Sequence, residues 1–174
     1  MDALEFEKML KTHEKDIFSF CLYLAQDSHK AADLYQESLL TAFEKRDKII
    51  PDNNPKALIF SIAIGKWRNI RRKESRRQII APGLSLEDNV AVLAAPAEIN
   101  PESQALSQYE KSVIRENLAT MDDKFRIPLI LLYFDDWDLK SIAQALKLPV
   151  GTVKSRLHKG RSLIKKALEQ EGGK

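Results

Sequence analysis

The chain has 174 residues, of which 30% are charged and 44% apolar, and its formal net charge is +3. This is an ordinary globular composition, and the length suits one compact domain or two small ones. No apolar run approaches the roughly 18 residues of a membrane span, and acids stand where a secretory signal is basic, so a cytoplasmic protein without membrane insertion is expected. With Cys21 as the single cysteine, neither an intrachain disulfide nor a cysteine metal cluster is expected.

The charges fall into blocks along the chain. Residues 56–80 carry eight basic and one acidic side chain, and residues 147–174 carry eight and two. Residues 81–110 carry five acids and no base, whereas residues 1–55 carry seven bases and eleven acids. Two separate basic blocks are the pattern expected of two contacts with a polyanion.

Apolar residues at helical spacing predict a first helix over residues 3–25. Asp27 or Ser28 can cap a second helix, which is expected to run from about His29 to Arg46. The inward face of this second helix is expected to consist of Ala32, Tyr35, Leu39, Leu40 and Phe43.

A third helix is expected from Pro55 to about Arg77, after a loop at 51–55. Its first half, ALIFSIAIG, is almost wholly apolar and predicts burial, whereas its second half, KWRNIRRKESRR, is strongly basic. Asn69 can read a base edge, the arginines can neutralise phosphates, and Trp67 has a face on which a base could stack. The alternatives are a core position for the tryptophan and solvated arginines. The candidate nucleic-acid-binding residues of this helix are Trp67, Asn69, Arg71 and Arg72.

Helix-breaking residues and a lack of Lys and Arg predict a flexible linker over residues 79–100. The chain is therefore expected to be all-α, with two small helical domains at 1–78 and 101–174. Domains of this size are only marginally stable alone. Capping and breaking signals predict four helices in the second domain. Their expected extents are 101–120, 123–134 with Pro128 inside it, 139–146 and 151–169.

The last two of these helices form a helix-turn-helix pattern. One apolar face is expected from Ile142, Ala143 and Leu146, and a second from Val153, Leu157, Gly160, Ile164 and Leu168. The opposite face of the last helix is polar and basic, and the N-terminal half of such a helix can reach base edges in the major groove. The alternative is an amphipathic helix whose basic face is only solvated. The candidate DNA-binding residues are Lys154, Ser155, Arg156, His158 and Lys159.

Three segments of the chain resemble regions of one protein family. Thr120 to Leu168, and above all LPVGTVKSRLHKGR within it, closely resembles region 4 of extracytoplasmic-function (ECF, group 4) sigma factors of the sigma-70 family. AADLYQESLLTAF looks like region 2.2 of that family, and NPKALIFSIAIGKWRNIRRKESRR resembles its regions 2.3 and 2.4. The three motifs stand in the family's order across nearly the whole chain.

The resemblance implies a sigma factor that binds core RNA polymerase and directs promoter recognition and opening in transcription initiation. It implies that polymerase contacts Asp33, Gln36 and Glu37, that the candidates on the third helix melt and read the −10 element, and that those on the last helix read the −35 element. The implied partners are core polymerase, promoter DNA and an anti-sigma factor, the expected location is the nucleoid with polymerase, and no cofactor is expected. The chain departs from common family residues at Leu58-Ile59, Gly65 and Met121-Asp122.

Two other classes of function compete with this interpretation. A free-standing helix-turn-helix transcription regulator would use the last two helices and leave the basic third helix without a role. An enzyme is not expected, because His13, His29 and His158 lack metal-ligand spacing, and neither a glycine-rich phosphate loop nor a nucleophile with a base is evident. Trp137 and Leu139 are candidates for an anti-sigma contact, with a core position as the alternative.

Overall fold

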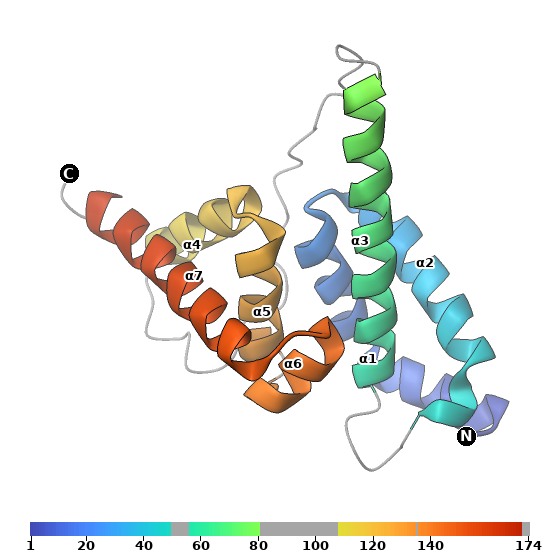
Figure 1. The fold of residues 1–174 in the computed structure, drawn as a ribbon. Helices are drawn as coiled ribbons and strands as arrows, with labels where there is room; N and C mark the ends of the chain where they lie inside the picture. Colours follow the sequence, from blue (N-terminus) through green and yellow to red (C-terminus); the bar gives the residue numbers. More distant parts are fainter. Residues whose placement is uncertain (50–55, 81–107, 135, 172–174) are drawn as a thin grey trace. The chain divides into compact units, whose positions relative to one another are not determined.

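The structure, a computed structural model, describes residues 1–49, 56–80, 108–134 and 136–171. These residues form seven α-helices and one 3-10 turn, and no strand occurs among them. The chain divides into two compact units, Met1–Ala95 and Pro96–Lys174 (Figure 1). The prediction of an all-α chain with two small helical domains is confirmed. The predicted loop at 51–55 and most of the predicted linker lie outside the described residues.

The first unit is a bundle of three helices, each in contact with the other two: α1 (Ala3–Ala25), α2 (Ser28–Glu44) and α3 (Lys56–Ile80). The 3-10 turn Arg46–Lys48 follows α2. Asp2 and Glu5 form a capping box at the start of α1, and the Asp27 side chain accepts a hydrogen bond from the Lys30 N–H at 2.8 Å. These local signals explain why the predicted bounds of α1 are confirmed and why α2 begins where a cap was expected.

Aromatic and aliphatic side chains from all three helices fill the core of this unit. The rings of Phe20 and Phe60 are stacked with their centroids 4.0 Å apart, and both side chains are fully buried. The apolar first half of α3 contributes Ile59 and Ile64 to the same core, as its sequence predicted. Cys21 is also buried, and desolvation raises the pKa of its thiol to about 12. The thiol is therefore protonated at neutral pH and behaves as a small core residue.

The predicted inward face of α2 is wrong by about one residue of rotation. The side chains that α2 buries are those of Ala31, Leu34, Ser38 and Ala42. By contrast, Leu40 is 68% and Phe43 is 41% exposed. Small residues at the buried positions let α2 approach its neighbours closely, and the Ser38 hydroxyl donates to the Leu34 carbonyl at 2.6 Å. Because this bond satisfies the hydroxyl inside its own helix, a serine is tolerated where the apolar pattern favoured leucine.

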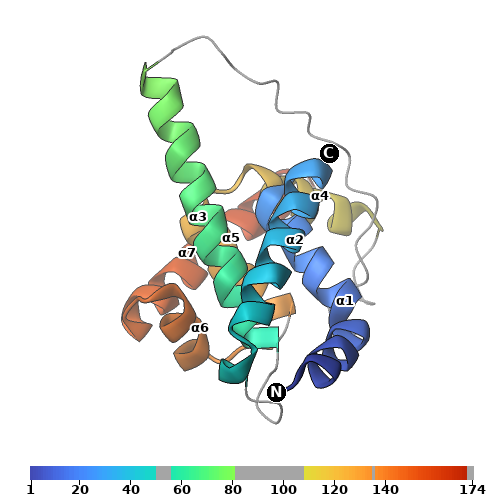
Figure 2. The ribbon, with the colours of Figure 1, turned by 90° about the vertical axis from the view of Figure 1, so that its right-hand side faces the viewer.

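The second unit is built around α7, which contacts the other three helices: α4 (Gln108–Thr120), α5 (Asp123–Phe134), α6 (Leu139–Leu146) and α7 (Val150–Glu171). The bounds predicted for the helices at 123–134 and 139–146 are confirmed. The Asp138 carboxylate caps α6 by accepting from the Ser141 N–H at 2.6 Å. Pro128 lies inside α5 and is fully buried. Figure 2 shows α6 leading through a short turn into α7.

The turn between α6 and α7 sets the angle between these two helices. Lys147 adopts a left-handed conformation with φ of 54°, and the Leu148 N–H donates to the Ala143 carbonyl at 2.9 Å. Farther along α7, a Cβ at Gly160 would lie 2.7 Å from Leu129 Cδ1. Gly160 therefore lets α7 lie directly against α5. No helix in the described part of the chain is long and apolar enough to cross a membrane.

Candidate nucleic-acid interface

The two faces of α7 are separated as the sequence predicted. Val153 and Leu157 are buried, and Gly160 lies with them against α5. The polar face of α7 consists of the exposed side chains Lys154, Ser155, His158 and Lys159. The Ser155 hydroxyl donates to the Thr152 carbonyl at 3.0 Å, which leaves the hydroxyl lone pairs as acceptors. The structure thus brings four of the five predicted residues onto one solvent-facing surface of α7.

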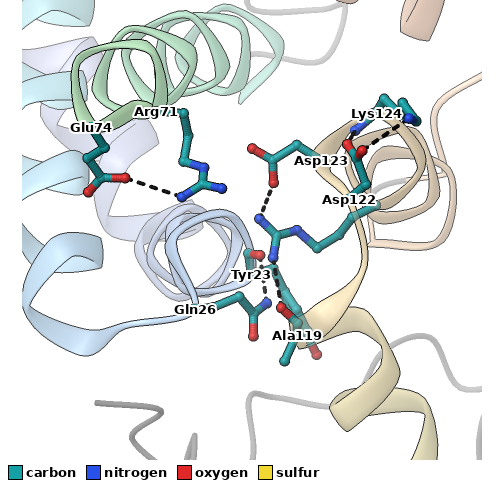
Figure 3. Close-up of polar contacts among 9 residues, drawn as sticks. Tyr23, Gln26, Arg71, Glu74, Ala119, Asp122, Asp123 and Lys124 are labelled. Carbon is teal, nitrogen blue, oxygen red and sulfur yellow. Dashed lines mark hydrogen bonds and ion pairs between the residues drawn. The ribbon is translucent and has the colours of Figure 1, made fainter. Parts of the chain in front are cut away.

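Arg156 is the predicted residue that does not join this face. It is only half-exposed, and it lies toward the turn between α4 and α5. The pKa of the Asp122 carboxyl is lowered there, first by the hydrogen bond from the Lys124 N–H and to a lesser extent by the charges of Lys124 and Arg156. Figure 3 shows the pairing of Lys124 with Asp122.

The basic half of α3 runs past the ends of α1 and α2, as both ribbon views show (Figures 1 and 2). Asn69 and Arg72 are exposed and three residues apart, so they lie on one face of the helix. Trp67 lies on the opposite side and is only 3% exposed. The structure therefore places this tryptophan in the core, the alternative that the sequence left open, and its ring presents no free face to a base.

Arg71 is engaged within the protein rather than aligned with Asn69 and Arg72. Its Nη1 lies 3.2 Å from a Glu74 carboxylate oxygen (Figure 3). Its guanidinium carbon lies 5.9 Å from the centroid of the Trp67 ring. The other carboxylate oxygen of Glu74 lies 3.1 Å from the Lys30 Nζ, so Glu74 links α2 to α3. A phosphate would have to compete with this carboxylate for Arg71.

The acidic surface of α2 carries the three predicted polymerase contacts. Asp33, Gln36 and Glu37 are all exposed. A Glu37 carboxylate oxygen lies 3.4 Å from the Lys66 Nζ at the start of the basic half of α3. Leu40 and Phe43, which the sequence placed inward, are exposed beside them on the same helix. Apolar side chains whose spacing predicted burial therefore lie beside the polar candidates on the surface of α2.

Two contacts in the second unit were not predicted from the sequence. Arg126 is 5% exposed, although it stands in an apolar run; its guanidinium pairs with Asp123 and donates to the Ala119 carbonyl at 3.5 Å. Figure 3 shows the Asp123 and Ala119 ends of these contacts. The second feature is a contact between Tyr133 on α5 and Arg161 on α7. Asp123 and Arg126 stand three residues apart on α5, so their pairing has a local signal, whereas the burial of Arg126 and the contact of Tyr133 with Arg161 depend on which helices meet.

Gly65→Ala is expected to raise the free energy of unfolding of the first unit by about 0.5–1 kcal/mol. Gly65 is exposed inside α3, and a Cβ there would meet nothing within 4 Å, so only the helix propensity changes. Urea denaturation measures the change. Gly160→Ala in α7 of the second unit is the contrasting variant, because its Cβ would press on Leu129 and offset the same gain in helix propensity there. A loss of stability for Gly65→Ala would contradict the expectation.

Comparison with known proteins identifies the family. The family model for Sigma-70 region 2 matches residues 9–77, and the model for Sigma-70, region 4 matches residues 112–164. The ECF RNA polymerase sigma factor SigW of Bacillus subtilis (strain 168) is 26% identical over 169 residues, which are 96% of this chain and 90% of SigW. The chain belongs to the ECF sigma factors of the sigma-70 family. The ECF RNA polymerase sigma-E factor of Salmonella typhimurium (strain LT2) is 25% identical over 178 residues, 94% of this chain and 92% of that protein.

Two solved structures share the fold of this ECF sigma factor. The sigma factor RpoE in its complex with the anti-sigma factor NepR from Bartonella quintana has a TM-score of 0.73 and 24% identity, over 95% of this chain and 97% of RpoE. CnrH in complex with the cytosolic domain of CnrY has a TM-score of 0.61 and 17% identity, over 97% and 90% of the two chains. The family models, rather than these structures, assign the α1–α3 unit to region 2 and the helix-turn-helix to region 4.

Proposed function

We propose that this ECF sigma factor directs transcription initiation through three surfaces that the two units present separately. The domains proposed are region 2 at 1–78, a linker at 79–100 and region 4 at 101–174. The observation that carries the proposal is the exposed polar face of α7, which stands on a buried apolar face within a region 4 match. A sigma factor supplies no catalytic chemistry. It uses binding energy to position polymerase and to stabilise unpaired promoter DNA.

The deciding experiment mixes the full chain, purified without any anti-sigma partner, with core RNA polymerase. A stable complex that transcribes a promoter from the same genome is the expected result. Failure to form the complex would remove the sigma-factor proposal. Tight, sequence-specific duplex binding without polymerase would instead favour a free-standing regulator.

The exposed surface of α2 is the proposed contact with core polymerase. Asp33, Gln36 and Glu37 supply acceptors for a basic or polar partner surface, and Leu40 and Phe43 supply apolar area next to them. An apolar centre with a polar rim is the common arrangement of a protein interface. Of these residues, Phe43 also packs edge-to-face against the buried Phe6 ring, with the two centroids 5.5 Å apart.

The basic half of α3 is the proposed contact with the −10 element. Asn69 and Arg72 share an exposed face and are suited to a base edge and a phosphate, respectively. Arg71 can join them, but its exposed pair with Glu74 competes with a phosphate. Trp67 is buried in the core, so it supports α3 by packing and does not stack on a base.

Lys159→Ala is expected to weaken recognition of the −35 element by about 1–3 kcal/mol, because Lys159 is exposed on α7 and can donate to a guanine. The measurement is the affinity of the holoenzyme for duplex promoters with each base pair of the −35 element changed in turn. The variant should lose its preference at one position. An equal loss on every sequence would show that Lys159 touches only phosphate.

An anti-sigma factor is the proposed regulator, and the cytoplasm, with polymerase on the nucleoid, is the proposed location. The support is that both solved neighbours, RpoE and CnrH, are bound to another protein, NepR and the cytosolic domain of CnrY. Trp137 is 5% exposed and therefore a core residue rather than a contact, and Leu139 is only partly exposed. Exposed apolar residues elsewhere, such as Val150, suit such a contact better.

A further inference from the structure

Arg161 is the one exposed arginine of α7, and a residue of another helix holds its guanidinium group. The Arg161 Nε donates to the Tyr133 hydroxyl at 2.7 Å, and the guanidinium carbon lies 5.5 Å from the centroid of the Tyr133 ring. Tyr133 stands near the end of α5 and is 43% exposed, so the contact lies at the surface. Within the described ranges, no carboxylate forms an ion pair with Arg161.

This contact orients the guanidinium and leaves its terminal N–H donors available to an anion. A guanidinium has five N–H donors in a planar fork, and Tyr133 occupies only the one on Nε. The two terminal nitrogens stay available for the bidentate geometry that suits a phosphate. Because the side chain is already held by the hydroxyl and the ring, less rotamer entropy is lost when a ligand binds.

Arg161 also lies in line with other basic side chains of α7. Lys154, His158, Arg161 and Lys165 follow one another at spacings of four, three and four, and all are exposed. We call these four residues the basic stripe. Two of them belong to the polar face of α7, so the stripe forms its edge. A helix that lies in the major groove has a phosphate backbone along each edge, and contacts with phosphate fix its register.

We propose that Arg161 is a phosphate-binding residue of α7, and that Tyr133 is the residue that positions it. The proposal deepens the −35 role given to α7 and rests on that role. Lys159 then discriminates between bases, whereas Arg161 sets the position of the helix on the duplex without reading sequence. The ligand is the phosphodiester backbone of double-stranded DNA.

The test measures how holoenzyme affinity for a duplex promoter depends on salt between roughly 50 and 200 mM. Arg161→Ala should lower affinity roughly tenfold at the low-salt end and reduce the slope of log K against log salt by about 1, equally on every −35 sequence. Arg161→Lys should restore the slope but only part of the affinity, because it keeps the charge and loses the fork. Lys8→Ala, an exposed lysine of α1, is the charge-matched control. An unchanged slope for Arg161→Ala, or an equal change for Lys8→Ala, overturns the phosphate contact.

Tyr133→Phe tests the positioning role, because it keeps the ring and removes only the hydroxyl acceptor. We expect a loss of roughly three-fold in affinity with an unchanged salt slope. In an Arg161→Ala background the same change should have no further effect, since Tyr133 acts through Arg161. Additive losses in the double variant would overturn the positioning role. If Lys159→Ala still alters base preference while the Arg161 predictions fail, the −35 proposal stands and this inference alone is wrong.

Discussion

Phe60→Ala is expected to lower the free energy of unfolding of the α1–α3 unit by about 3–5 kcal/mol. The Phe60 ring is fully buried and stacked on Phe20 at 4.0 Å, so its removal leaves a cavity and a ring without its neighbour. A loss of this size is a large fraction of the stability of a small domain, and polymerase binding through α2 should fall with it.

Trp67 reports on this unit when Trp137 is replaced by Phe, because the chain has two tryptophans and Trp67 is buried in the α1–α3 core. Urea denaturation followed by its fluorescence gives the change in free energy. Leu40→Ala is the matched control in the same unit; Leu40 is 68% exposed, and the expected change is within about 0.5 kcal/mol. A Phe60→Ala loss no larger than that of Leu40→Ala would contradict the core described above.

Arg126→Ala is expected to destabilise the α4–α7 unit by about 2–3 kcal/mol. Arg126 is 5% exposed, and its removal leaves the partly buried Asp123 carboxylate and the Ala119 carbonyl without the guanidinium. The hydrogen bond to the Ala119 carbonyl connects the end of α4 to the first turn of α5. Since α5 lies against α7, promoter binding should weaken along with stability.

The control for this prediction separates packing from charge. Arg126→Met keeps much of the side-chain volume, and in combination with Asp123→Asn it leaves no unpaired charge, so the double variant should recover part of the loss. The measurement is urea denaturation followed by Trp137 fluorescence in a Trp67→Phe background, because Trp137 is buried in this unit. Equal losses for Arg126→Ala and for the double variant would show that the unpaired Asp123 carboxylate is not the cause of the loss, and would contradict this explanation.

Most helix bounds could be predicted because the signals that set them are local. The capping box of Asp2 and Glu5 and the caps Asp27 and Asp138 each act within one turn of helix. The buried face of α7 followed in the same way from its 3.6-residue period. α3 extends to Ile80, three residues beyond the predicted end at about Arg77, because its polar last turns carry no stop signal before Ile80.

The orientation of α2 could not be predicted by the same reasoning. Leu40 and Phe43 are more apolar than Ala31 or Ser38, so a count of apolar residues favours the wrong face. Which face turns inward depends on how closely α1 and α3 approach, and close approach selects small residues. The apolar side chains left outside belong to the proposed polymerase surface, which is where a conflict between pattern and fold is expected.

The sequence by itself determined the helices, the family and the polar face of α7, because caps, periodicity and the order of motifs are properties of neighbouring residues. Only the tertiary structure decided what each basic or aromatic side chain is free to do. It buried Trp67, paired Glu74 of α3 with Lys30 of α2 and placed Arg161 against the Tyr133 hydroxyl. The physical reason is that burial and hydrogen bonding depend on partners from other helices, and no local pattern records which partners those are.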